Sequence, residues 1–315
     1  MLRYILKRLL MMIPVLIGVS LIIYLICGTN TDPILIKLAG AEASPEDLAA
    51  LEKTLGFDRP VLVRYVEYMG GLVRGDLGKS HLTNRYVMED FLMYIPLTLK
   101  LSFSSILVSI IIALPLGIFS ALKQGTLLDN ISMVAALIGM SMPAFWLGLL
   151  LLLGFSLKMH IFPSGGANDG IMSFILPAIT AGISLCGGVT RQTRSSMLEV
   201  IRADYLRTAR AKGCSEKTVI IKHALRNALI PIITLTGANL AATLAGSSVV
   251  ETVFALPGVG RQVVVAVGNR DVNVVTGFMV LQAMITSFVM LGVDLLFALV
   301  DPRIKGQFAK GGKKA

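Results

Sequence analysis

Six long apolar runs constrain this chain more than any other feature of its sequence. Crossing the hydrocarbon core of a bilayer, about 30 Å thick, takes roughly 20 helical residues, and each run is long enough. Because backbone groups in lipid must find partners within the protein, such runs fold as helices. We therefore expect an all-α polytopic membrane protein with six transmembrane helices. The expected spans are Ile5 to Cys27, Leu97 to Leu122, Asn130 to Leu157, Ile171 to Thr190, Ala228 to Val250 and Val272 to Val300.

Composition supports a membrane protein. Hydrophobic residues make up 55% of the 315 positions and charged residues 15%, and the mean hydropathy is +0.76, well outside the range of soluble domains. The first run follows Arg3, Lys7 and Arg8, as a signal peptide would. However, Leu9 to Cys27 is 19 uncharged residues, longer than a typical signal core, and no small-residue cleavage pattern follows. We interpret it as a retained first helix.

The distribution of lysine and arginine predicts the orientation. Nine of these residues lie between Arg191 and Arg226 and five between Arg303 and Lys314, whereas most of those on the other side fall in one long loop. Because the positive-inside rule is weak for long loops, the short basic segments determine the orientation of the chain in the membrane. Both termini are then cytoplasmic. The net charge of +10 therefore reflects orientation, and nucleic acid is not an expected partner, since no aromatic-basic stacking platform is present.

The expected domain organisation follows from these spans. Residues 28–96 form an extracytoplasmic cap in which Ser44 caps a helix that begins at Pro45. This segment has too few apolar residues for a core of its own. The full expected division is residues 1–27 as cytoplasmic N-terminus and first span, 28–96 as the cap, 97–300 as the transmembrane core with a cytoplasmic loop at 191–227, and 301–315 as a basic cytoplasmic tail.

Catalytic and metal-binding patterns are not found in the sequence. The cysteines Cys27, Cys186 and Cys214 have no partner at metal spacing, so neither an enzyme nor a cofactor is expected. Gly75 to Ser80 resembles a phosphate loop, but Val73 occupies the position of a required glycine. The spans are nearly free of ionisable groups. Asp294 is the exception, and we interpret it as a group that forms hydrogen bonds at the membrane interface.

The block from Arg202 to Pro231 is the basic segment that carries most information. Asp204 to Lys212 has good helix formers, Gly213 is a suitable C-terminal stop, and Ser215 is a plausible cap for a second short helix. The first helix combines cationic side chains with small or apolar ones. The alternative is a solvated loop whose charges only orient the protein. The cationic residues are Arg207, Arg210 and Lys212, and the small or apolar ones are Tyr205, Leu206, Ala209 and Ala211.

The run Asp204 to Gly213 resembles the EAA-type coupling motif of ABC importer permeases, in the form used by the dipeptide, oligopeptide and nickel transporter subfamily. Arg207, Thr208 and Ala209 occupy the positions of the Glu-Ala-Ala triplet, and the proline that follows is delayed to Pro231. Further matches occur in order along the chain. They are Leu2 to Leu9, Gly75 to Ser80, Ser141 to Trp146, Arg194 to Val200, Glu251 to Arg261 and Asp301 to Ile304.

The resemblance implies a type I ABC importer permease fold with a cytoplasmic coupling helix, in a bacterial or archaeal plasma membrane. It also implies four partners: a homologous second permease subunit, two cytoplasmic ATPase subunits and an extracytoplasmic substrate-binding protein. Asn239 and Thr243 are candidate polar residues of the translocation path. The expected ATPase-coupling residues are Asp204, Arg207, Thr208, Ala209, Arg210, Lys212 and Gly213.

Two questions stay open at this point. A secondary carrier or channel is the alternative function, although such a protein usually places ionisable residues near the middle of the membrane. The substrate is also undecided, because relatives with these motifs carry dipeptides, oligopeptides, glutathione, nickel or metallophores. The short loop from Leu157 to Ile171 resembles the nickel and oligopeptide members slightly more than the dipeptide members.

Overall fold

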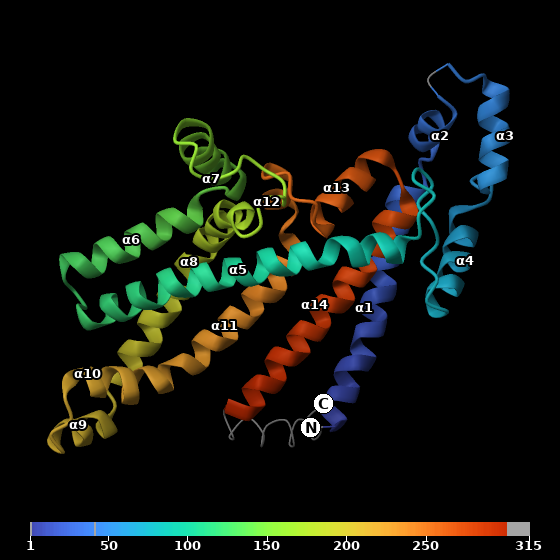
Figure 1. Cartoon of the computed structure of the whole chain (residues 1–315). Coiled ribbons are helices and arrows are strands. Elements are labelled where there is room, and N and C mark those ends of the chain that lie inside the picture. Colours follow the sequence, from blue (N-terminus) through green and yellow to red (C-terminus); the bar gives the residue numbers. More distant parts are fainter. Residues whose placement is uncertain (1, 41, 301–315) are drawn as a thin grey trace.

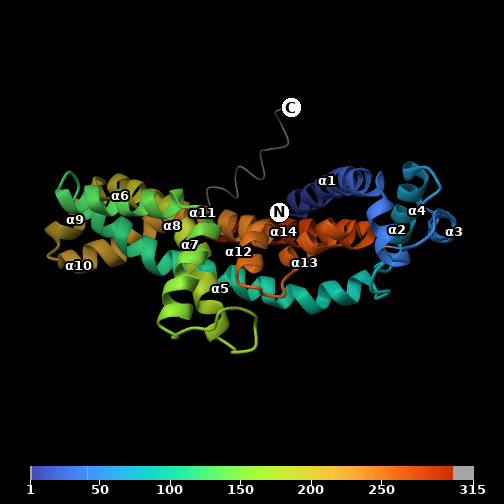
Figure 2. The same cartoon turned by 90° about the horizontal axis from the view of Figure 1, so that it is seen from above.

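The computed structural model describes residues 2–40 and 42–300, so the expected basic tail at 301–315 lies outside the described residues. Within them the chain is helical, and the longest helices run side by side (Figure 1). Three short helices, α2 (Asp32–Ala39), α3 (Pro45–Leu55) and α4 (Val61–Val73), gather at one end. Two others, α9 (Asp204–Ala211) and α10 (Glu216–Thr218), lie at the opposite end. Seen from above, the long helices form a broad, flat array (Figure 2).

Five described helices are long and apolar enough to cross a membrane, and a bent pair would make a sixth span. The expected positions are confirmed, but the helices run further than the apolar runs. The helix of the second span begins at Val87 rather than Leu97, and that of the fourth continues to Ile201 rather than ending at Thr190. The five helices are α1 (Leu2–Gly28), α5 (Val87–Leu122), α8 (Met172–Ile201), α11 (Leu225–Gly246) and α14 (Val272–Val300).

The third expected span, Asn130 to Leu157, is broken rather than straight. Helices α6 (Leu127–Ser141) and α7 (Ala144–Leu151) meet at 98°, and a π-helical segment, Leu152–Lys158, continues α7. Met142, between the two helices, has extended backbone angles (φ −71°, ψ 129°). Pro143 explains the break, because the ring of a proline disfavours the helical conformation in the residue before it.

The expected fifth span, Ala228 to Val250, also differs in its ends. Residues Glu216 to Gly246 form one continuous helical rod that includes α10, a π-helical segment and α11. The chain then forms the short helix α12 (Ser248–Val253), a loop, and α13 (Val259–Asn269) before it enters α14. The helical rod therefore connects the basic block directly to the fifth span.

Helices α5 and α8 pack together more extensively than any other pair, and small residues allow their close approach. A Cβ atom added at Gly117 of α5 would lie 2.5 Å from the Thr193 side chain of α8, and one added at Gly182 of α8 would lie 2.8 Å from Val108. Lipid is as apolar as leucine, so close packing of small residues is a main source of helix association in membranes. This pair forms the centre of the fold.

The cap packs on the spans instead of forming a separate unit, as expected. Tyr65 of α4 is bonded through its hydroxyl to Ser20 of α1, 2.9 Å away, and its ring lies 5.5 Å from that of Tyr24. At the start of α3, Ser44 and Asp47 form a reciprocal capping box, which confirms the predicted helix start. The cap's own core is limited to a small cluster around Ile34, Leu35 and Phe57.

Asp294 joins α14 to α1. Its Oδ2 accepts a hydrogen bond from the Tyr4 hydroxyl at 2.8 Å and lies 2.6 Å from a guanidinium nitrogen of Arg8. The carboxylate therefore bonds to polar groups near the N-terminal end of α1, which agrees with its interpretation as an interfacial group. Its partner Arg8 is one of the three basic residues that precede the uncharged part of the first apolar run.

A buried ion pair fixes the ends of α5, α6 and α8 to one another. The Asp129 side chain is 3% exposed and accepts two hydrogen bonds from Arg194, from Nε and Nη2, each at 2.8 Å. It also accepts from the Ser120 hydroxyl and from the backbone N–H of Gly125 at 3.0 Å. Such bidentate, charge-assisted contacts hold both groups in one geometry. The apolar runs did not predict these contacts of Asp129, because this residue lies directly before the expected third span.

We expect Asp129→Ala to destabilise the protein by about 2 kcal/mol, because it removes the charge-assisted hydrogen bonds of Arg194, whose side chain is only partly buried. The measurement is the thermal unfolding midpoint of the detergent-solubilised protein. Asp129→Ala combined with Arg194→Met should recover part of the loss. Asp204→Ala is the control, since the Asp204–Arg207 ion pair is almost fully exposed and such pairs contribute little. An unchanged midpoint for Asp129→Ala would contradict the assigned role.

The bent pair α6–α7 can be tested as a membrane crossing by labelling from the two sides. Thr83 and Ser215 are both exposed, and the chain between them contains α5, the bent pair and α8. If the pair crosses the membrane, single cysteines at Thr83 and Ser215 will label from opposite sides. The native cysteines are replaced first, and labelling uses a membrane-impermeant maleimide. Labelling of both positions from the same side would show that the pair is re-entrant.

Candidate functional site

The basic block from Arg202 to Pro231 folds as predicted, with a short helix, a glycine turn and a second capped helix. Gly213 follows α9 with φ +80°, the left-handed conformation that favours glycine at the end of a helix. Its N–H donates to the carbonyl of Arg210 at 2.9 Å. Ser215 caps α10 by accepting from the N–H of Thr218 at 3.4 Å. The sequence signals for both helix ends are confirmed.

One fully buried side chain anchors α9 to the transmembrane helices. Leu206 is 0% exposed and packs in a cluster to which α5, α8 and the helical rod contribute. Ala209 is half-buried against the same cluster. The remaining members of the cluster include Ala121, Met197, Val219, Ala224 and Ala228. Burial of a leucine contributes about 2 kcal/mol, so α9 is attached firmly by its apolar side.

The opposite side of α9 is exposed and charged. Six of the seven predicted coupling residues lie on this open surface, and Ala209 alone is half-buried. The exposed six are Asp204, Arg207, Thr208, Arg210, Lys212 and Gly213. Within the described residues they have few strong partners. Arg210 Nε donates to Glu216 of α10 at 2.7 Å, and exposed pairs of this kind contribute little to stability. The cationic surface is therefore accessible to a partner.

The basic block is joined directly to the helix of the fifth span. Tyr205 of α9 accepts a hydrogen bond from Asn227 of α11 at 2.8 Å, and the Arg210–Glu216 contact closes α9 against α10. The helical rod then runs without a break from Glu216 to Gly246. These contacts join α9 to α11, which carries both candidate path residues, Asn239 and Thr243.

Thr243 lines a cavity between α5, α8 and α11, whereas Asn239 does not. The cavity has a volume of about 180 Å³ and a mostly apolar wall into which hydroxyl groups are set. The hydroxyl-bearing residues are Thr243, Ser102, Ser105, Ser184 and Ser247. Asn239 is half-buried one turn away from Thr243 on α11. The structure therefore places one of the two candidates at an internal cavity.

Sequence reasoning missed the serine contribution of α5, although a signal was present. Thr98, Ser102, Ser105 and Ser109 recur at spacings of three and four residues, which places them on one face of a helix. All four are 0 or 1% exposed. Ser102 has no hydrogen-bond partner for its buried hydroxyl among the described residues, so it is available to a group in the cavity. The helical period of these hydroxyls identifies the inward face of α5.

A buried carboxylate holds the loop before α13, at the side of this cavity. Glu251 is 1% exposed and accepts from the hydroxyls of Thr98 at 2.8 Å and Ser247 at 2.7 Å. It also accepts from the backbone N–H of Arg261 at 2.9 Å. A Cβ at Gly258 would lie 2.3 Å from this carboxyl group. The run Glu251 to Arg261 is therefore a structural unit in which the Glu251 carboxylate accepts a hydrogen bond from a backbone N–H in the first turn of α13.

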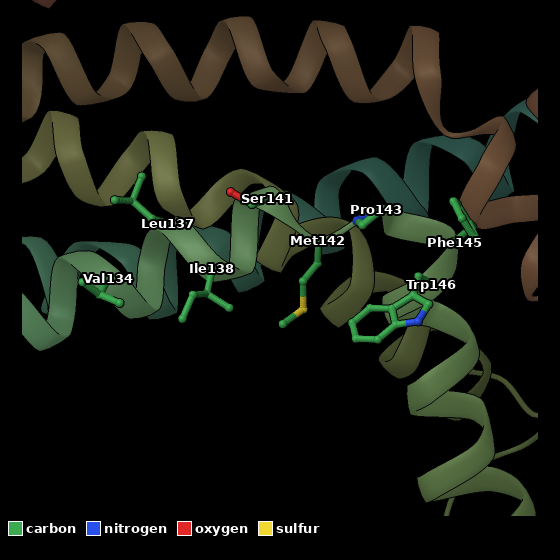
Figure 3. Close-up of a pocket in the computed structure, with 8 residues that line it drawn as sticks. All are labelled: Val134, Leu137, Ile138, Ser141, Met142, Pro143, Phe145 and Trp146. Atoms are coloured by element: carbon green, nitrogen blue, oxygen red, sulfur yellow. The ribbon is translucent and has the colours of Figure 1, made fainter.

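A larger hollow than the one at Thr243 lies elsewhere, at the bend between α6 and α7. It has a volume of about 610 Å³ and an almost wholly apolar lining. Figure 3 shows the side chains of Ile138, Met142 and Trp146 on one side of the bend. The residues that line it include no carboxylate, histidine or cysteine, and Ser141 contributes a hydroxyl group. Among the described residues, no three His, Cys, Asp or Glu side chains are grouped to hold a metal ion.

Two family models match the chain. Residues 113–306 match the binding-protein-dependent transport system inner membrane component, and residues 1–102 match the N-terminal part of such membrane components. The solved structure of the MetNI methionine ABC transporter in an inward-facing conformation aligns with 68% of this chain and 97% of its own, with a TM-score of 0.58 and 18% identity. This likeness shows a shared fold.

Curated relatives match over nearly the whole chain. The dipeptide transport system permease protein DppB of Alkalihalophilus pseudofirmus is 39% identical over 97% of this chain and all of its own. DppB of Escherichia coli K12 is 36% identical over 97% and 99%. The glutathione transport system permease protein GsiC of Salmonella choleraesuis is 37% identical over the same shares. This multi-pass membrane chain therefore belongs to the family of binding-protein-dependent transport system inner membrane components, the permease subunits of ABC importers.

Proposed function

We propose that this permease subunit imports short peptides and that its exposed helix α9 receives the movement of partner ATPase subunits. The observation that carries the coupling role is the combination of an anchored apolar side, including Leu206, with an exposed cationic side. A helix that only oriented the protein would need neither the anchor nor the rigid connection to α11. The seven residues from Asp204 to Gly213 named above form or support this docking surface.

Peptides are the proposed cargo because the relatives that match over the full length are named for dipeptides, di- and tripeptides and glutathione. The internal cavity is compatible with such a cargo. Its hydroxyl groups can bond to amide groups, and its apolar wall can contact side chains. Thr243 and Ser102 are the residues we assign to the path, with Asn239 one turn further along α11. Nickel and metallophore cargoes are the alternative that the same motifs leave open.

The proposed assembly contains this chain, a homologous second permease subunit, two ATPase subunits and a substrate-binding protein. The basic block lies on the cytoplasmic side with both termini, as the positive-inside rule indicates. The cap of α2, α3 and α4 then faces the binding protein. ATP binding shifts the assembly between inward-open and outward-open states, which requires that the ATPases bind the two states with different affinity.

Gly213→Asp should uncouple transport while the protein remains in the membrane. A side chain at φ +80° is strained by about 1 kcal/mol, and the carboxylate also places negative charge on the cationic surface of α9. No atom lies within 4 Å of the added Cβ, so the strain and the charge, rather than a steric clash, cause the effect. The measurement is ATP hydrolysis by the assembled complex, stimulated by loaded binding protein, which should fall several-fold.

Gly75→Asp is the matched control for this variant. Gly75 has φ +82° and no atom within 4 Å of an added Cβ, but it lies in the cap rather than the basic block. This variant carries the same backbone strain and the same added charge, and stimulated hydrolysis should stay near the wild-type rate. Equal hydrolysis by both variants would show that the turn after α9 has no coupling role.

Transport should depend on ATP hydrolysed by separate subunits. In proteoliposomes with the binding protein outside, the complex should import a labelled dipeptide only when ATP is in the lumen. Lys79→Ala, in the segment that resembles a phosphate loop, should leave hydrolysis intact, because the Lys79 amine lies over the Tyr86 ring at 4.5 Å. Uptake by this chain alone, driven by a proton or sodium gradient, would instead favour a secondary carrier. The buried Glu251 would then be the candidate carboxylate for ion coupling.

A further inference from the structure

A more polar pocket lies in the cap, away from the cavity assigned to transport. It is open to solvent, has a volume of about 240 Å³, and is lined by the end of α1, the end of α3, α4, the segment from Asp76 to His81 and Asn273 of α14. Figure 1 shows these elements together at the cap end of the molecule. Its lining combines charged groups with aromatic rings. The residues used below are Tyr24, Phe57, Arg64, Tyr68, Asp76 and His81.

Arg64 is the feature of this pocket that needs an explanation. The residue is 9% exposed, yet no carboxylate pairs with it among the described residues. Its Nη2 donates to the carbonyl of Gly28 at 2.7 Å, and its guanidinium lies 5.2 Å from the centre of the Phe57 ring. Its Nε is buried without a hydrogen-bond partner. A buried cation without a counter-charge is unfavourable, because a carbonyl and a ring replace only part of its hydration.

The other charged groups of the pocket do not supply that counter-charge. Glu67 is paired with Arg59 at 2.6 Å. Asp76 accepts a hydrogen bond from the N–H of Gly78 at 2.8 Å but forms no ion pair within the described chain. Burial lowers the pKa of His81, so this ring is mostly neutral at pH 7. Once the Arg59–Glu67 pair is set aside, Arg64 and Asp76 line the same pocket without being paired with each other.

We propose that this pocket is a binding site for a small zwitterion, an amino acid or a short peptide, whose carboxylate pairs with Arg64. A guanidinium matches a carboxylate in a planar, two-point contact. Asp76 is the group that faces the ammonium end, and the rings of Phe57, Tyr24 and Tyr68 form the apolar wall. The two carboxylates of the pocket disfavour a ligand with several negative charges, such as a phosphate ester. The site is independent of the cargo assigned to the path, because it lies in the cap.

The test is equilibrium binding of L-alanyl-L-alanine to the assembled complex in lipid nanodiscs, without binding protein and without ATP. The C-terminal amide of the same dipeptide keeps the ammonium group but lacks the carboxylate. The dipeptide should bind, and its amide should bind about tenfold more weakly, as expected for loss of a charge-assisted pair. Arg64→Gln should weaken dipeptide binding to a similar extent. Equal binding of the two probes, or equal binding to wild type and Arg64→Gln, would overturn the proposal.

Two further variants separate binding from folding. Arg74→Gln is the matched control, since Arg74 is exposed at the end of α4 and does not line the pocket, and binding should be unchanged. Asp76→Asn changes an exposed residue, so it should fold normally and weaken binding of the dipeptide but not of its N-acetyl derivative.

If Arg64→Gln binds the dipeptide normally but no longer recruits the binding protein, Arg64 is instead a docking residue for an acidic side chain, and the proposal is wrong. Because no step requires transport, failure of this site leaves the proposed import function untouched.

Discussion

The close packing of α5 against α8 is the interaction on which the rest of the structure depends. Glycines at Gly117 and Gly182 allow the two backbones to approach, and any side chain there would overlap the neighbouring helix. In a membrane, where burial of apolar surface contributes little, such proximity is what holds helices together. It also brings the serine face of α5 to the cavity and positions Arg194 of α8 to bind Asp129.

Polar contacts at the two ends of this pair hold the neighbouring helices in place. At one end, the Asp129–Arg194 ion pair holds the start of α6 beside the buried cluster into which α9 inserts Leu206. At the other, Glu251 holds α12 and α13 against Thr98 of α5. Each carboxylate binds several donors at once, so each can hold separate helices in a fixed relation. In the coupling role proposed above, α11 would connect α9 to the cavity, because it is joined to α9 by the Asn227–Tyr205 hydrogen bond and carries Thr243.

Much of the architecture could be predicted from local signals. The apolar runs located the spans, Ser44 and Ser215 marked helix starts, and Gly213 marked a helix end, because each signal depends on neighbouring residues alone. The bend at Pro143 was missed because an apolar run does not reveal its own interruption when both halves are apolar. The roles of Asp129 and Glu251 were missed because their partners are distant in sequence. Of the two candidate path residues, Thr243 lies at the cavity, but Asn239 does not.

The sequence by itself determined the class of protein, the number of apolar segments and the cationic helix, since hydrophobicity, charge and capping are properties of short segments. It also carried the motifs of the family. Tertiary structure alone decided which hydroxyl groups share a cavity, which carboxylate joins which helices, and that Arg64 is buried without a counter-charge from any residue that the structure describes. Those features depend on contacts between residues far apart in the chain, and such contacts are set by the packing of whole helices against one another.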